Sequence, residues 1–207
     1  MHIKYFLSAF LVLLALFGLS ACEQNSPAEK TSSETKPVTA PAAKAAEPSP
    51  FILTASIHDI MLSIVDPSAD DMWNSVSTIS TMDGITENRP RTDEDWLLLR
   101  HKAITLIEAT NLLAMQGRRV VNDGQKLQDE GLEGNLTAAQ IQKLIDDDHK
   151  TFVAFAHGLH GAGMEMLKAI DDKDVDAFLQ AGGDLDTACE ACHVKYWYPG
   201  HGIPGGD

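Results

Sequence analysis

The spacing of apolar residues from Phe51 onward limits the possible fold more than any other feature of the chain. Four successive stretches carry apolar residues at intervals of three and four, and none alternates apolar and polar residues as a half-buried strand does. These intervals place the apolar side chains on one face of an α-helix, and such a face is stable when it is buried. The spacing therefore predicts an all-α domain over residues 51–207.

The first helical stretch should change course at Asp66-Pro67, where we expect a kink or a restart with Asp66 as the cap. Its apolar stripe before that point consists of Ile57, Ile60, Met61, Ile64 and Val65. Met72, Trp73 and Val76 continue the apolar face. A loop rich in turn-forming residues should follow over residues 80–91.

Two more helices begin at capping signals. Thr92 and the acidic residues after it predict a second helix that runs to about Met115. Its inward side chains should be Trp96, Leu99, Ala103, Leu106, Ile107 and Leu113. After a polar connection over residues 118–136, Thr137 and Gln140 form a capping box that predicts a third helix to about Ile170. This helix should bury Ile141, Leu144, Ile145, Phe152, Leu159 and Met166.

A fourth helix, starting at Asp174 or Asp176, leads into Cys189-Glu190-Ala191-Cys192-His193. A Cys-x-x-Cys-His run is typical of a c-type haem attachment site. Both sulfurs then lie on one side of a helical turn, where they can bond to the haem vinyl groups, and the histidine binds the iron from below. The alternatives are a redox dithiol, half of a zinc site, or two buried thiols beside an unrelated histidine. A redox motif needs a βαβ context, and a zinc site needs a second ligand pair.

The N-terminal region predicts export and lipidation. Lys4 precedes an apolar run over residues 5–19, which is typical of a signal peptide over residues 1–21. Leu19-Ser20-Ala21-Cys22 resembles a bacterial lipobox, so Cys22 should carry lipid; the alternative is a plain secretory peptide cut after Ala21. Residues 22–50 should form a disordered tether rich in Ala, Pro and Ser. Glu23 slightly favours the outer membrane.

A formal net charge of −14 indicates which partners to expect. An acidic chain is a poor ligand for nucleic acid or an anionic lipid surface, whereas a basic redox protein would be attracted to it. A homodimer is also possible. The chain carries no motif for paired catalytic carboxylates, a nucleophile elbow or a phosphate-binding loop, so we do not expect an enzyme.

Four helices with the haem motif on the last one resemble the cytochrome c-prime and cytochrome c556 family over residues 51–198. The resemblance implies an antiparallel four-helix bundle holding one covalent haem c between its helices. Gly158, Gly161 and Gly163 would then allow a close approach to the flat haem. The connections after the first and second helices are longer than in compact family members, and Lys195 stands for the usual basic residue after the haem histidine.

The sixth position of the iron is open to three interpretations. In the cytochrome c556 branch a methionine from the first helix fills it, and Met61 matches that place, so we expect Met61 to be the ligand; the alternative is a core methionine. His58 is an alternative ligand, and an empty apolar pocket is the third interpretation. Trp96, Arg100 and Tyr196 should lie at the haem pocket, with Arg100 near a propionate. His157 and His160 have a spacing that can share a metal but more often lie in solvent or in packing.

These features together predict a monohaem electron carrier, tethered by lipid on the periplasmic side of a bacterial envelope. The first alternative is a five-coordinate haem protein that binds nitric oxide or carbon monoxide. The second is a haem-bearing accessory subunit of a larger redox complex.

Overall fold

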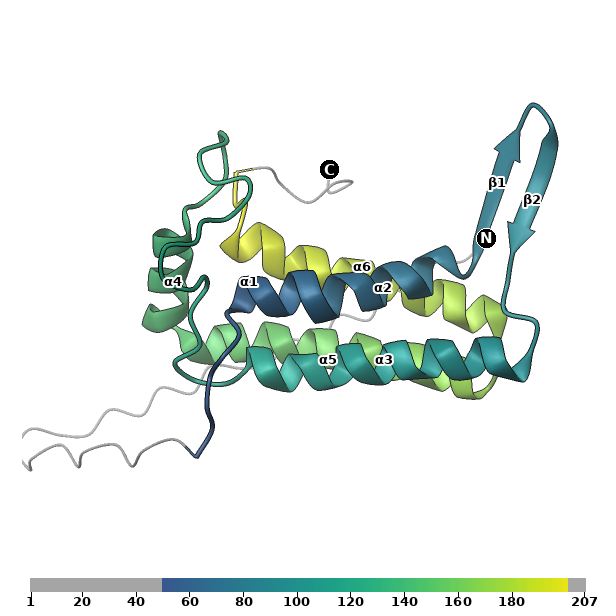
Figure 1. Ribbon diagram of the computed structural model, residues 1–207, viewed down its shortest axis with the longest axis horizontal. Helices are drawn as coiled ribbons and strands as arrows, with labels where there is room; N and C mark the ends of the chain where they lie inside the picture. The colour runs from purple at the N-terminus through teal and green to yellow at the C-terminus, as the bar shows by residue number, and fades with distance from the viewer. Residues whose placement is uncertain (1–49, 201–207) are drawn as a thin grey trace, which may run out of the picture. The chain divides into compact units, whose positions relative to one another are not determined.

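Helices dominate residues 50–200, which are the part of the chain that the computed structural model describes. The predicted signal peptide, the predicted lipidation site Cys22 and nearly all of the predicted tether lie outside the described residues. The helical elements are α1 (Ile57–Ile60), the π-helical turn η1 (Met61–Val65), α2 (Asp66–Asn74), α3 (Asp93–Leu113), α4 (Ala138–Asp147), α5 (His149–Asp171) and α6 (Val175–Tyr196) (Figure 1).

The first helical stretch restarts at Asp66-Pro67, as predicted: it widens into η1 just before the proline, and α2 begins at Asp66 with Pro67 in its first turn. The backbone N–H of Asp66 donates to the carbonyl of Met61, five residues earlier. Pro67 has no N–H and its ring crowds the carbonyl four residues before it, and a wider turn relieves that crowding. Asp66 is therefore the first residue of α2 and not its side-chain cap.

The predicted loop over residues 80–91 is wrong in part, because residues 77–88 form a β-hairpin. Strand β1 (Ser77–Thr81) pairs antiparallel with β2 (Gly84–Asn88), and Thr81 lies opposite Gly84. β-branched threonine and isoleucine favour the extended strands, and Gly84 has a φ of +133° that few other residues adopt. The described residues are thus mostly helical, with one small two-stranded sheet, and not all-α.

The capping signals at Thr92 and Thr137 are confirmed. The Thr92 side chain accepts from the Asp95 backbone N–H, while the Asp95 carboxylate accepts from the Thr92 N–H, and Thr137 and Gln140 are paired in the same way. All six side chains predicted to face inward from α3 are buried.

The third predicted helix is wrong in one respect, since it consists of two helices that meet at Asp148. Asp148 leaves the helical conformation at φ −145° and ψ 68°, and its carboxylate accepts from the Thr151 backbone N–H to cap α5. A local side-chain bond of this kind competes with continued helix. α4 therefore turns away from α5, and Leu144, which was expected inside, is 37% exposed.

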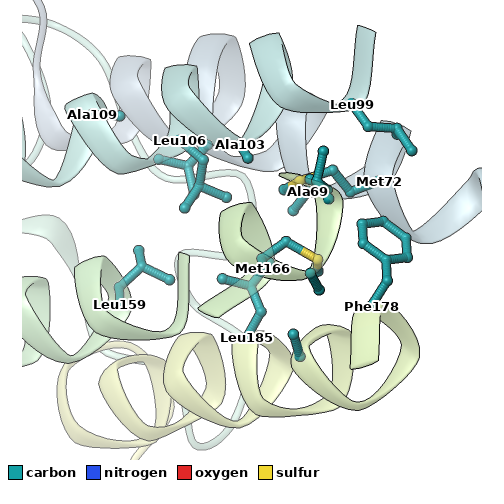
Figure 2. Packing of buried hydrophobic residues seen from close by; sticks show 14 of the residues in the cluster. Ala69, Met72, Leu99, Ala103, Leu106, Ala109, Leu159, Met166, Phe178 and Leu185 are labelled. Carbon is teal, nitrogen blue, oxygen red and sulfur yellow. The ribbon is translucent and has the colours of Figure 1, made fainter. Parts of the chain in front are cut away.

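The core forms where α2, α3, α5 and α6 meet. Figure 2 shows their side chains in one cluster, which includes Met72, Leu106, Met166, Phe178 and Leu185. α3 and α5 lie close together at Gly163, where an added Cβ would lie 2.8 Å from Cγ1 of Ile107. The expected close approach is therefore present at Gly163, toward a helix, but Gly158 and Gly161 have no neighbour within 4 Å in the Cβ direction.

Contacts between the long helices are uneven. α3 packs against α2 and α5, and α5 packs against α6, but α6 makes few direct contacts with α1, η1 or α2. The hairpin projects from one end of the helices, and α4 and the connection before it lie at the other end (Figure 1). No helix within residues 50–200 is long and apolar enough to cross a membrane.

Candidate haem-binding site

The weakly contacted side of α6 borders a cavity of about 330 Å³. Its walls come from α1, η1 and α2, from α6, from α4 and α5, and from the connection between α3 and α4. Cys189, Cys192 and His193 all line it, and so do Met61 and Tyr196. The structure therefore brings the motif of the fourth helix and the proposed sixth ligand to one cavity.

Both cysteines of the motif are free and half-buried on the last turns of α6. Burial raises the pKa of Cys189 to about 11 and that of Cys192 to about 12, and nearby carboxylates add to the shift at Cys189. Both groups are neutral thiols at neutral pH in the chain without haem. A catalytic redox dithiol needs a lowered pKa, and the single sheet in residues 50–200 is a hairpin and not part of a βαβ unit. These observations count against a redox pair.

His193 lies one residue beyond the second thiol, against the edge of Trp197 at a centroid distance of 5.2 Å. Burial lowers the pKa of His193, and the charges of Glu190 and Asp66 partly oppose that shift. A neutral imidazole is the form that binds a metal ion. Within residues 50–200 no group of three or more His, Cys, Asp or Glu side chains is placed to hold a metal ion.

The wall contributed by the first helical stretch carries both proposed sixth ligands. Met61 is the first residue of η1 and His58 lies one turn earlier; both side chains are half-buried and both line the cavity. The backbone N–H of His58 donates to the Val120 carbonyl at 3.0 Å, which fixes this wall to the connection after α3. π-helical turns occur often at functional sites.

Two of the predicted pocket residues lie elsewhere. Trp96 is buried against Phe178 with a ring distance of 6.1 Å and does not line the cavity. Arg100 pairs with Asp171 at 2.8 Å on the surface, so its assignment to a propionate is corrected. Apolar periodicity placed Trp96 inside correctly, but it gives no information on which end of the helix meets the cavity.

Tyr196 lies where it was predicted, in the cavity wall. It is buried, and its ring packs edge-on against Phe152 and Phe155 at 5.4 and 5.8 Å. His157 is exposed, and Nδ1 of His160 lies 3.1 Å from the hydroxyl of Thr110. Through this hydrogen bond, His160 takes part in the packing of α3 against α5.

Sequence reasoning missed part of the wall. Leu127, Gln128 and Asp129 from the connection and Ile141 and Ile145 from α4 cover one end of the cavity. The connection has no periodic pattern that could have revealed this, whereas the capping pattern at Asp148 could have indicated the turn that brings α4 over the cavity.

Comparisons of this chain with protein-family models, with curated proteins and with solved structures found no match.

The donor groups and the walls fit a haem. Two thiols three residues apart and an adjacent imidazole are the attachment groups of haem c. The remaining wall is mainly apolar, including Val65, Phe155 and Leu159, and the volume lies within the range of roughly 300–1,000 Å³ typical of cofactor pockets.

Proposed function

We propose that this protein is a monohaem c-type cytochrome that acts as an electron carrier. In this proposal the long helices form an antiparallel four-helix bundle, and one haem c occupies the space between α6 and the α1–α2 side. The observation that carries the proposal is the uneven packing: the helices contact each other closely except where Cys189, Cys192 and His193 face a cavity. A flat cofactor would supply the missing contacts there.

Each residue of the motif has a defined task. The Cys189 and Cys192 thiols would hold the haem covalently, each through one thioether bond to a vinyl group. His193, whose pKa burial lowers, would be the imidazole ligand of the iron. When bound, haem supplies a one-electron iron couple. The apolar walls would exclude water, and Met61, which lines the same cavity, would be the candidate thioether ligand.

The carrier would work at the bacterial envelope. Cys22 as a lipid attachment site and the tether to residue 50 would hold the domain on the periplasmic side, and the net charge of −14 favours a basic redox partner. These parts of the proposal rest on the sequence.

The first experiment tests covalent attachment. The full-length protein, expressed with the cytochrome c maturation system, should keep its haem on a denaturing gel and give a c-type pyridine haemochrome spectrum. Cys189→Ala and Cys192→Ala should each reduce or abolish haem content, whereas Cys22→Ala, the matched control, should alter lipidation and leave the haem in place. Haem that is extracted intact by acidic acetone from the wild type contradicts the proposal.

The second experiment decides the sixth position. If Met61 is the ligand, the ferric protein is low-spin with the weak far-red band of methionine ligation, and Met61→Ala makes it high-spin and able to bind carbon monoxide. His58→Ala should leave the spectrum unchanged. A wild-type spectrum that is already high-spin, and that Met61→Ala does not alter, favours a gas-binding haem protein instead of a carrier.

A further inference from the structure

The charged groups of the cavity wall all have the same sign. The lining residues include Asp66, Asp129, Asp186 and Glu190, and none of them is lysine or arginine. Arg100, the cation predicted to serve the pocket, is paired with Asp171 elsewhere. The wall therefore surrounds the proposed haem with negative charge that no cation of the wall offsets.

Three of the carboxylates come from two helices, α2 and the motif-bearing α6. Asp66 begins α2, and Asp186 and Glu190 lie one turn apart on α6. Their charge acts on the groups that would hold the haem: Asp186, Asp66 and Glu190, in decreasing order, help to raise the pKa of Cys189, and Glu190 and then Asp66 oppose the shift at His193. Burial is the larger cause at both sites.

Glu190 is the carboxylate with the most fixed position. It lies within the motif, is half-buried, and its Oε2 accepts a hydrogen bond from the Tyr198 hydroxyl at 2.7 Å. Asp66 and Asp186 are exposed, so water and salt screen them more strongly. Because Glu190 is the least exposed of these three carboxylates and acts more strongly than Asp66 on His193, the proposed iron ligand, it should have the largest effect on the iron, followed by Asp66.

We infer that Glu190, with a smaller contribution from Asp66, lowers the reduction potential of the haem by stabilising the ferric state. Ferric iron carries one more positive charge than ferrous iron, so a nearby carboxylate favours the oxidised form. This opposes the thioether of Met61, which raises the potential. The inference rests on the proposed function and adds specific residues that set the driving force for electron transfer.

The test is a spectroelectrochemical titration of the full-length haem protein and three variants. Glu190→Gln keeps an acceptor for the Tyr198 hydroxyl and should shift the potential upward, also at high salt. Asp66→Asn should give a smaller upward shift that decreases as salt is added. Asp70→Asn is the matched control, because Asp70 lies one turn beyond Asp66 on α2, is exposed, and is not part of the wall. It should leave the potential nearly unchanged.

Haem content and the ferric spectrum of each variant show separately that attachment and ligation are intact. A potential for Glu190→Gln that is unchanged, lower, or shifted only as far as that of Asp70→Asn overturns the inference and leaves the proposed function standing. A wild-type protein without covalent haem overturns both, and the pyridine haemochrome spectrum reveals this before any titration.

Discussion

Replacing Gly163 by alanine should destabilise the protein, although alanine is the better helix former. In a helix interior, Gly→Ala adds about 0.5–1 kcal/mol of stability because glycine loses more conformational freedom on folding. At Gly163, however, the new Cβ would lie 2.8 Å from Cγ1 of Ile107 and 3.4 Å from Cδ2 of Leu106. Ile107 is β-branched and buried, so its Cγ1 cannot move far without shifting α3 against α5.

The size of the effect follows from these opposing terms. Overpacking by one methyl group in a dense core costs about 1–3 kcal/mol. After subtracting the gain in helix propensity, we expect Gly163→Ala to lose up to about 2.5 kcal/mol of unfolding free energy. Gly161→Ala, on the same helix with open space around its Cβ, should gain about 0.5–1 kcal/mol.

Urea unfolding followed by far-ultraviolet circular dichroism measures both variants on the full-length protein. In an Ile107→Ala background the penalty at Gly163 should largely disappear, because the atom that the new methyl group meets is gone. If Gly163→Ala proved as stable as Gly161→Ala, the close approach of α3 and α5 described here would be wrong.

Three further results are expected from the same unfolding assay. Arg118 is buried and donates hydrogen bonds to the carbonyls of Leu112 and Ala55. Arg118→Met should therefore lower the unfolding free energy by about 1.5–3 kcal/mol. An unchanged urea midpoint would show that water replaces the guanidinium. Thr137→Ala removes the cap of α4 and should lower the unfolding free energy by about 0.5–2 kcal/mol. A much larger loss would mean that the stability of the whole fold depends on α4. Hydrogen bonds from two backbone N–H groups hold the pKa of Asp95 below its ordinary value of 3.8. The contribution of Asp95 to stability is therefore complete above pH 3.8 and is lost as the pH falls through the lower pKa of the folded state. Asp95→Asn should reduce this acid sensitivity in unfolding measured from pH 7 down to pH 2, and an unchanged pH profile would count against the capping box as its source.

The positions of the long helices could largely be predicted, because local chemistry determines them. Thr92 and Thr137 each satisfy backbone N–H groups that a helix start leaves unpaired, and the same pairing occurs in almost any surroundings. The inward side of α3 followed from periodicity, since a side chain's place around a helix depends only on its position in the chain. The motif of Cys189, Cys192 and His193 was likewise visible, because its spacing is contained in one helical turn.

The hairpin and the break at Asp148 were missed although their causes are local. Asp83-Gly84 between threonine and isoleucine residues is a turn signal, and Asp148 before Thr151 is a cap signal. Helical periodicity on either side of Asp148 is compatible with one helix or with two, and the apolar pattern alone does not distinguish them.

The sequence by itself determined where most helices begin, which of their faces are buried, and which residues are candidates for attaching a haem. Only the tertiary structure decided which of these residues share a cavity: it put Met61, His58 and Tyr196 there, left Trp96 and Arg100 outside, and added Glu190 and Asp66 as wall charges. The reason is that helix formation depends on neighbours within about four residues, whereas a cavity depends on the distances between helices. Here α3 and α5 approach closely at Gly163, whereas α6 makes few contacts with α1, η1 and α2, and residue spacing along one helix carries no information about either.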